Sequence, residues 1–387
     1  MQLVAYGAQD IYLTGNPQIT FFKVVYRRHT NFAMESIEQA FTGSVDFGRK
    51  CSCTIDRNGD LLHKMYLEVD VTSNNSLVNA GNGNLGHSLI REVEITIGGQ
   101  CVDKHYGEWL ELWTQLTSTE QCLTKARTLT NGTLRSGDES SRKLYIPLQF
   151  WFNRNPGLAL PLIALQYHEV KLTVFLNDSK AATGTSGGVS DVNMCLFCDY
   201  IFLDTDERRR FAQVSHEYLI EQLQYNNCIS VKAGEACSNV ELRLNHPCKE
   251  LVWVVQNQDQ AENGDTAFKF GAGGAAADNL LSAKLQLNGH DRFRERDGTY
   301  FRCVQPYQHH TGGHKQDAKG NGYMYVYSFG LEPEEHQPSG TCNFSRIDNA
   351  VLQLEMEKAG NKFVKVYATN YNVLRVMSGM GGLAYSN

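Results

Sequence analysis

The sequence predicts an all-β chain made of two homologous domains, each a sandwich or barrel of antiparallel strands. Three observations carry this prediction: segments that recur at a nearly constant offset, strands with period-two alternation, and turns rich in Asn and Gly. At 387 residues the chain is long enough for two domains that each bury a core. We therefore expect one fold to occur twice.

The recurrence consists of four segments of the first half that return in the same order in the second half, about 180 to 190 residues later. Each match is weak alone, but four matches in one order are hard to obtain by chance. The pairs are His29–Gln39 with His216–Gln224, Met65–Val69 with Leu251–Val255, Ile95–Gln100 with Leu285–His290, and Val170–Leu172 with Ala350–Leu352.

Several of these segments alternate apolar and polar residues, which is the pattern of a strand with one buried face. The clearest cases are Met65–Val71, Val93–Ile97 and Leu352–Met356. Turns such as Asn58-Gly59-Asp60 and Asn288-Gly289 separate the strands and favour a sandwich or barrel over a parallel α/β sheet.

One helix is predicted between the strands, because an apolar face recurs there at helical spacing. Its face comprises Tyr106, Trp109, Leu110, Trp113 and Leu116, with Glu108 and Glu111 turned away. We expect this helix to pack on its own barrel. It lies in one of four long polar insertions that we expect at one end of the barrels: Ser73–His87, His105–Arg142, Gln256–Asn279 and Pro306–Gly322.

Charge, hydropathy and cysteine content restrict the function classes. A net charge of −6 opposes general affinity for nucleic acid, and no run of about 18 apolar residues could span a bilayer. Met1–Asp10 lacks the features of a secretory signal. The 11 Cys residues have no disulfide-framework spacing, so we expect mostly buried, reduced thiols in a cytosolic folding environment.

The sequence contains only weak motifs for catalysis or metal binding. The cluster His309, His310 and His314 falls in a predicted loop and is interpreted as solvated. No nucleophile elbow, phosphate loop or zinc ribbon is present in the sequence. We therefore predict no catalytic residues, no cofactor and no metal site. Asn74 and Asn131 begin sequons in predicted outer loops and are candidate glycosylation sites.

Two other functions remain open on these residues. A metal-dependent bicupin enzyme would also have two barrels, although neither half shows paired His on a strand. A carbohydrate-binding protein of two sandwiches would use exposed aromatic rings. The candidates for such rings are Trp109, Trp113, Trp151 and Trp253, of which Trp253 and the helix pair fit core positions better.

Long blocks of the chain resemble the major capsid proteins of nucleocytoplasmic large DNA viruses, and those of the phycodnaviruses of algae in particular. The blocks are distributed over the whole chain, which makes the resemblance specific. They are Leu3–Asp10, Tyr12–Lys23, Tyr26–Arg28, Pro156–Val170, Asp199–Thr205, His216–Ile220, Gln337–Asn349 and Asn372–Tyr385.

The resemblance implies two tandem eight-stranded antiparallel jelly-roll barrels with long surface loops and a short helix. It implies an N-terminal arm at 1–22 on the inner side of a capsomer, a first jelly-roll domain at 23–207 and a second at 208–387. The implied function is structural rather than enzymatic. The chain would trimerise into pseudo-hexagonal capsomers that tile an icosahedral shell, since three copies of two similar barrels give six lobes.

The resemblance also implies partners and a location. Beyond its own homotrimer, the chain would contact neighbouring capsomers, minor capsid proteins, a penton protein and the internal viral membrane, without direct sequence-specific binding of nucleic acid. It would be a late protein of the virion, synthesised and assembled in the host cytoplasm. The insertions Gln256–Asn279 and Pro306–Gly322 are shorter than is usual in the family.

Overall fold

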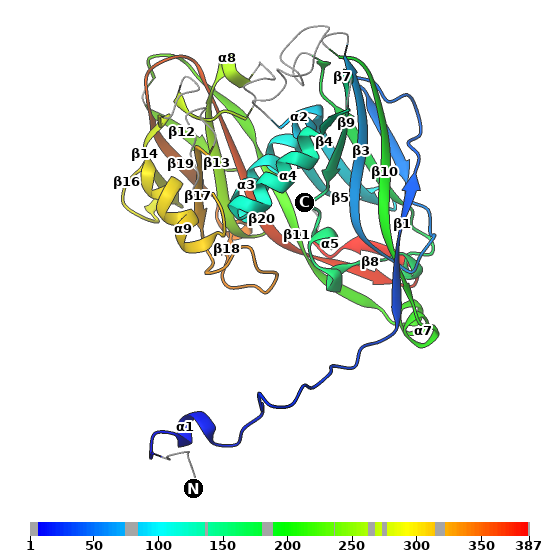
Figure 1. Cartoon of the computed structure of the whole chain (residues 1–387). Helices are drawn as coiled ribbons and strands as arrows, with labels where there is room; N and C mark the ends of the chain where they lie inside the picture. Colours follow the sequence, from blue (N-terminus) through cyan, green and yellow to red (C-terminus); the bar gives the residue numbers. More distant parts are fainter. Residues whose placement is uncertain are drawn as a thin grey trace.

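Four antiparallel sheets, arranged as two pairs, make up the body of the chain, and an extended arm leaves it at the N-terminus (Figure 1). We call the N-terminal pair of sheets the first lobe and the C-terminal pair the second lobe. The computed structural model describes residues 7–73, 84–135, 138–179, 189–235, 237–261, 268–272, 277–313 and 322–385.

The first lobe contains sheets A and B. Sheet A has the order β1-β10-β3-β7-β6, and sheet B the order β2-β9-β4-β5. Sheet A comprises β1 (Phe32–Gln39), β10 (Val189–Leu203), β3 (Leu61–Ser73), β7 (Asp138–Pro147) and β6 (Thr133–Arg135), with β8 (Leu160–Pro161) paired to β3. Sheet B comprises β2 (Lys50–Thr54), β9 (Val170–Leu176), β4 (Ile90–Ile97) and β5 (Gln100–Tyr106).

The second lobe contains sheets C and D, with the orders β11-β20-β13-β17 and β12-β19-β14-β15. Sheet C comprises β11 (His216–Val231), β20 (Lys362–Met377), β13 (Pro247–Asn257) and β17 (Met324–Ser328), with β18 (Cys342–Asn343) and β21 (Met380–Leu383) at its margins. Sheet D comprises β12 (Cys237–Glu241), β19 (Ala350–Met356), β14 (Leu280–Leu287) and β15 (His290–Asp291), with β16 (Arg296–Asp297) paired to β14.

The two lobes have the same topology. If the eight principal strands of each lobe are numbered along the chain, both lobes show the orders 1-8-3-6 and 2-7-4-5, which are those of a jelly roll. All four predicted repeat pairs fall on equivalent strands: β1 with β11, β3 with β13, β4 with β14, and β9 with β19. The predicted fold class is confirmed with one correction, because each lobe is two facing sheets and not a closed barrel.

Equivalent hairpins preserve even the turn conformation. Gly98 and Gly99 join β4 to β5 with φ of 58° and 82°, and Asn288 and Gly289 join β14 to β15 with φ of 50° and 79°. Two successive residues at positive φ are what a tight two-residue hairpin demands, and Asn and Gly tolerate that region best. The duplicated sequence therefore encodes a duplicated turn.

Strand alternation places the cores as predicted in β3, β4 and β19. In β3, the apolar side chains at Met65, Leu67, Val69 and Val71 are at most 1% exposed. The run in β13 differs, because both of its faces are buried from Cys248 to Gln256. A strand that is covered on both faces has a continuous run of apolar residues instead of an alternation of apolar and polar residues. A second layer must therefore cover the outer face of sheet C.

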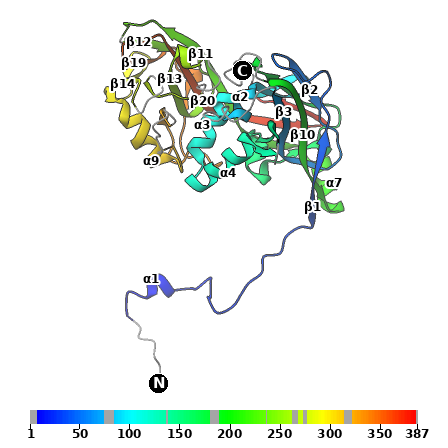
Figure 2. The same cartoon turned by 45° about the horizontal axis from the view of Figure 1, so that its top comes forward.

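The helices exceed the single one predicted. That helix is confirmed as α3 (Gly107–Thr117), and Figure 2 shows it between the two lobes. Among the described residues, the other α-helices are α1 (Ile11–Thr14), α2 (Leu85–Leu89), α4 (Glu120–Asn131), α5 (Trp151–Arg154), α7 (Thr205–Gln213), α8 (Gln258–Ala261) and α9 (Gln305–His309). In the described part of the chain, 3-10 turns lie at Pro156–Leu158, Leu162–Ala164 and Phe344–Arg346, and a π-helical turn at Tyr300–Val304 leads into α9.

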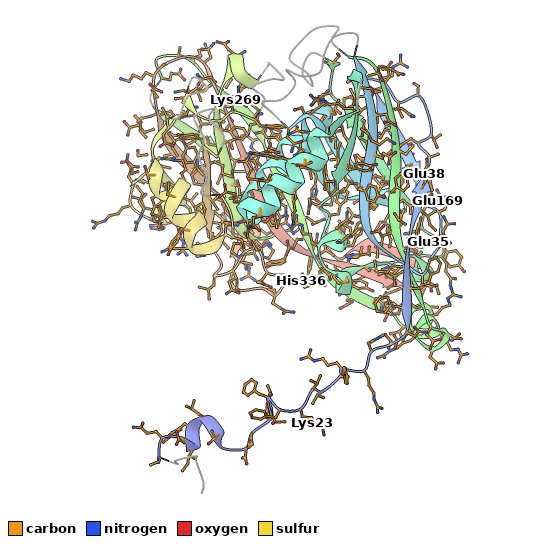
Figure 3. The ribbon with its side chains drawn as sticks, in the orientation of Figure 1. Lys23, Glu35, Glu38, Glu169, Lys269 and His336 are labelled. Atoms are coloured by element: carbon orange, nitrogen blue, oxygen red, sulfur yellow. The ribbon has the colours of Figure 1, made fainter. Side chains whose placement is uncertain are left out.

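The N-terminal arm, residues 7 to 31, runs away from both lobes with only α1 as regular structure (Figure 1). Figure 3 shows Lys23 on this arm, far from the sheets. Many of its apolar side chains are exposed, and Phe21 and Phe22 are 94% and 99% exposed. Such a contiguous exposed apolar segment is typical of a surface that another molecule covers.

The two lobes share part of one core. Strands β11 and β20 are each 16 residues long, and one end of each reaches the first lobe. There Ile220, Leu374 and Val376 join the apolar cluster of sheets A and B. The lobes are therefore joined by side-chain packing as well as by the chain itself.

Candidate functional site: the seam between the lobes

An apolar contact between the lobes is made by α3, which lies on the outer face of sheet C. We call this contact the seam. Its α3 side chains are Trp109, Leu112, Trp113 and Leu116, and its principal sheet side chains are Val252, Val254, Met324, Val326 and Tyr367. The rings of Trp109 and Tyr367 lie 5.6 Å apart. The seam explains why β13 is buried on both faces. The expectation that α3 packs on its own lobe is confirmed, because Leu110 joins the core of sheets A and B, but another face of α3 covers sheet C of the second lobe.

Charged side chains border this apolar contact. Glu108 of α3 forms an ion pair with Lys365 of β20. Arg154 lies 2.9 Å from Glu221 of β11, and its guanidinium carbon stands 4.0 Å from the ring centroid of Trp113. Because an Arg stacked on an aromatic ring and paired with a carboxylate is held in one orientation, these contacts fix the angle between the lobes.

The opposite side of α3 holds a buried carboxylate. Glu111 was predicted to point away from the protein, but it is 2% exposed and lies 2.8 Å from Nδ1 of His87. Gln115 and Asn84 also donate hydrogen bonds to it. Burial raises the pKa of Glu111, but the contacts with His87 and Gln115 outweigh it and lower the pKa to about 2. The charged Glu111 thus anchors α3 to the first lobe.

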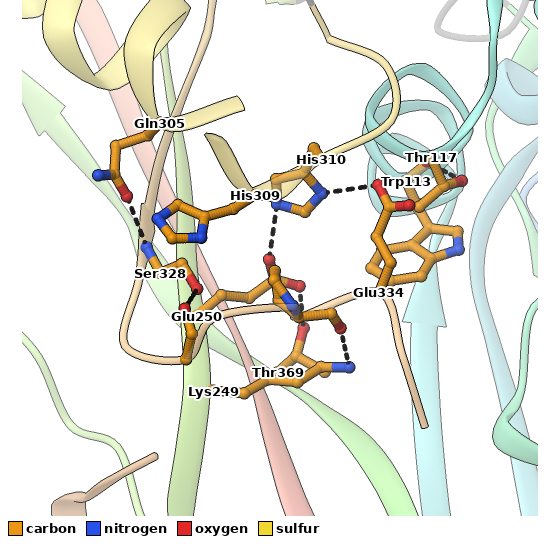
Figure 4. A network of polar contacts seen from close by, with 12 residues as sticks. Trp113, Thr117, Lys249, Glu250, Gln305, His309, His310, Ser328, Glu334 and Thr369 are labelled. Carbon is orange, nitrogen blue, oxygen red and sulfur yellow. Dashed lines mark hydrogen bonds and ion pairs between the residues drawn. The ribbon is translucent and has the colours of Figure 1, made fainter. Parts of the chain in front are cut away.

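A second buried network lies around His310 in the second lobe (Figure 4). The His310 Nε2 is 3.0 Å from Glu250 Oε2, an ion pair without hydrogen-bond alignment, and its Nδ1 is 3.0 Å from Glu334 Oε1. Thr311 donates two hydrogen bonds to Glu334, and Thr369 donates one to Glu250. The interpretation of this histidine as a solvated loop residue is therefore wrong.

The electrostatics of this network favour a charged histidine. Burial lowers the pKa of His310, but the two carboxylates outweigh it and raise the pKa to about 9. Burial raises the pKa of Glu250 and of Glu334, yet the contacts with His310 hold both below their ordinary value. Two carboxylates around one imidazolium form a structural clamp between β13 and the segment that follows α9.

The bicupin enzyme would need a metal site, and the carbohydrate-binding protein would need exposed aromatic rings. Neither network provides these features. No three His, Cys, Asp or Glu side chains in the described ranges gather closely enough to hold a metal ion, and His314 lies outside those ranges. Trp109, Trp113, Trp151 and Trp253 are at most 5% exposed, so none offers a ring to a sugar. The seam joins the lobes, the Glu111 network fixes α3 to the first lobe, and the His310 clamp stabilises the second lobe.

The two candidate glycosylation residues differ in what can be said of them. Asn74 lies outside the described residues. Asn131 is the last residue of α4 and is half-buried, and its Oδ1 accepts a hydrogen bond from the backbone N–H of Leu85. Glycosylation at both positions stays a prediction.

None of the helices in the described part of the chain is long and apolar enough to cross a membrane.

All 11 cysteines are free thiols, and the expectation that most are buried is wrong. Four are buried: Cys51, Cys53, Cys198 and Cys248. Burial raises the pKa of the Cys51 and Cys53 thiols to about 11, and a thiol that remains protonated is a poor nucleophile.

We expect these four thiols to resist modification in the folded protein. With Ellman's reagent at pH 8, absorbance should report exposed thiols at once and the buried four only after guanidinium is added. Equal rates for all 11 in native buffer would contradict this burial.

A jelly-roll topology that occurs twice in one chain defines the class of double jelly-roll proteins. Comparison with known proteins agrees. The family "Major capsid protein N-terminus" matches residues 20–204, and the family "Large eukaryotic DNA virus major capsid protein" matches residues 207–382. Together the two matches span most of the chain.

Individual relatives support the same assignment. A major capsid protein of Pyramimonas orientalis virus is 54% identical, and one of Paramecium bursaria Chlorella virus 1 is 44% identical. Each alignment covers 100% of this chain and 99% of the relative. The structure of the PBCV-1 virus capsid gives a TM-score of 0.82 at 40% identity and covers 95% of this chain and 100% of that one. The chain therefore belongs to the family of large eukaryotic DNA virus major capsid proteins, which are structural capsid subunits.

Proposed function

We propose that three copies of this chain form a homotrimer that serves as a pseudo-hexagonal capsomer of an icosahedral shell. The observation that carries the proposal is the duplication. Three copies of a chain with two lobes of identical topology present six similar lobes, so an object with three-fold symmetry can occupy a six-fold lattice position. The seam supplies an example of how two such lobes fit side by side.

The proposed organisation is an arm at 1–22, a first jelly-roll domain at 23–207 that begins with the extended residues 23–31, and a second jelly-roll domain at 208–387. Supporting this division, the strands of sheets A and B lie between Phe32 and Leu203, and those of sheets C and D between His216 and Leu383. The exposed apolar arm suits a position on the inner side of the capsomer, where neighbouring proteins could cover it.

The wider role follows from membership of the capsid family. We propose that the protein has no enzymatic activity and acts in the virion, after synthesis and assembly in the host cytoplasm as a late protein. Its partners would be neighbouring capsomers, minor capsid proteins, a penton protein and the internal viral membrane. The net charge of −6 fits a shell that makes no sequence-specific contact with the genome.

The solution mass of the purified protein, measured by light scattering together with a metal assay, tests the trimer. We expect a stable species of three times 43.5 kDa without stoichiometric metal. A monomer that carries one metal ion per jelly roll would instead support the bicupin enzyme.

A further inference from the structure

We propose that the helical segment Gly298–His309 of one copy packs on the outer face of sheet A of a second copy. This contact would repeat between chains the seam that α3 makes within the chain. We call the segment the docking helix, and the receiving side chains Tyr66, Tyr145, Pro147 and Phe197 the docking face. The inference rests on the proposed trimer and names the residues that join its copies.

The docking helix is the counterpart of α3 in the second lobe. Both begin at a glycine, Gly107 and Gly298, in the connection that follows the equivalent strands β5 and β15. A Cβ atom at Gly107 would lie 2.2 Å from the carbonyl oxygen of Ile90, and one at Gly298 would lie 2.4 Å from that of Leu280. Ile90 and Leu280 are the first residues of the equivalent strands β4 and β14, so the two helices start in the same place in each lobe.

With these glycines aligned, the seam side chains of α3 correspond to a stripe on the docking helix. Trp109, Leu112, Trp113 and Leu116 align with Tyr300, Cys303, Val304 and Tyr307. The first set is buried against sheet C, whereas Val304 is 39% exposed and Tyr307 is 78% exposed. Tyr300 packs against the core of the second lobe and Cys303 is half-buried, so Val304 and Tyr307 form the exposed part of the stripe in the single chain.

The docking face lies at the positions of sheet A that correspond to the seam in sheet C. Tyr66 of β3 aligns with Val252 of β13 in the sequence repeat. Its strand partners Phe197 and Pro147 then correspond to Tyr367 and Val326, and Tyr145 corresponds to Met324. All four docking-face side chains are half-buried, while their counterparts are covered by α3.

The docking face also has the aromatic rings and the neighbouring cavity that suit a protein interface. The rings of Tyr66 and Phe197 stack at 5.2 Å, and the ring of Tyr145 lies 6.2 Å from that of Tyr66. A cavity of about 680 Å³ opens beside Tyr66, Tyr145 and Pro147, which is large enough for several side chains of a second copy. Aromatic rings beside a cavity are typical of the centre of an interface.

A single chain cannot satisfy this contact by itself. Figure 1 shows α9 at one side of the molecule and sheet A at the other. Contact between two different surfaces of identical chains is heterologous, and it generates a ring if the rotation closes. With one such contact within each chain and an equivalent one between chains, the ring closes after three chains if each contact rotates the next lobe by one sixth of a turn.

The test is the solution mass of the double variant Val304→Asp/Tyr307→Asp, because a carboxylate on each side chain would be desolvated by docking. We expect the mass to fall from three times 43.5 kDa to 43.5 kDa, with the circular dichroism spectrum unchanged. The control is Met380→Asp, an exposed apolar residue of β21 outside the docking helix, which should remain trimeric. A double variant that stays trimeric overturns the docking contact and leaves the proposed trimer intact, while a monomeric wild type overturns both.

A second measurement does not depend on how the double variant folds. A photo-reactive p-benzoylphenylalanine at position 304 of the otherwise wild-type protein should form crosslinks between chains, seen as dimer and trimer bands in a denaturing gel. Mass spectrometry should place the crosslinks in peptides from β3, β7 or β10. Crosslinks that join chains only through other segments would contradict the docking face.

Discussion

The variant His310→Leu should be less stable than the wild type by about 3 to 5 kcal/mol in free energy of unfolding, since it leaves a buried carboxylate without its partner. Glu250 is fully buried, and in the wild type His310 provides its counter-charge at 3.0 Å. Leucine fills similar space but supplies neither charge nor N–H. Urea denaturation followed by tryptophan fluorescence measures the loss.

The neighbouring His309 offers a matched control. It bonds the backbone carbonyl of Leu331 near the surface and contacts neither carboxylate of the clamp. His309→Leu should change the free energy of unfolding by about 0.5 kcal/mol or less. Equal losses in the two variants would show that the effect comes from the local backbone and not from the ion pairs.

The same clamp makes stability depend on pH. The pKa of His310 rises from 6.5 to about 9 on folding, so its contribution is complete below pH 6.5 and is lost as the pH rises through about 9. The pKa values of Glu250 and Glu334 are lowered from 4.5, so their contribution is complete above pH 4.5 and is lost at lower pH. The wild type should therefore lose stability between pH 6.5 and 9, and His310→Leu should not show that slope.

The second large effect is expected for Trp109→Ala, which removes the more deeply buried of the two Trp side chains of the seam. Truncation of a buried Trp costs about 3 to 5 kcal/mol, and Trp109 is 1% exposed against Tyr367. Because the lost packing lies between the lobes, we expect the first and second lobes to unfold in two separate steps. Differential scanning calorimetry distinguishes two transitions from one.

Trp109→Phe should retain most of the contact and a single transition. As an external control, Leu129→Ala on α4 shortens a side chain that is 46% exposed and should have little effect. One transition at the wild-type temperature for Trp109→Ala would mean that the ends of β11 and β20, and not the seam, hold the lobes together.

The local alternation of apolar and polar residues predicts those strands and helices that have one face against the core and the other face in water. The alternation in β3 and the helical spacing around Trp109 are of that kind, and both elements form where expected. The duplication could also be predicted from the sequence, because equivalent strands keep similar residues under the same packing constraints.

The sequence could not reveal which distant surface covers an element. The sequence pattern predicts Glu111 on the solvent-facing side of an amphipathic helix. In the structure Glu111 is buried, and its contacts with His87 and Gln115 offset the free-energy cost of burying its charge. His310 sits in a Gly-rich segment that reads as a loop, while its partners Glu250 and Glu334 lie 60 residues before it and 24 after it. One signal was available: the unbroken apolar run Leu251–Val255 indicates a strand covered on both faces.

The long strands β11 and β20 have a mechanical consequence. Because Ile220, Leu374 and Val376 are embedded in the first lobe, bending one lobe against the other would pull apolar side chains out of a close-packed core. This packing opposes bending between the lobes, so we expect the described part of each chain to behave as one stiff tile. A closed shell built from such tiles must take up all of its curvature in the joints between them, so the stiffness of the particle would be set by contacts at the edges of each tile.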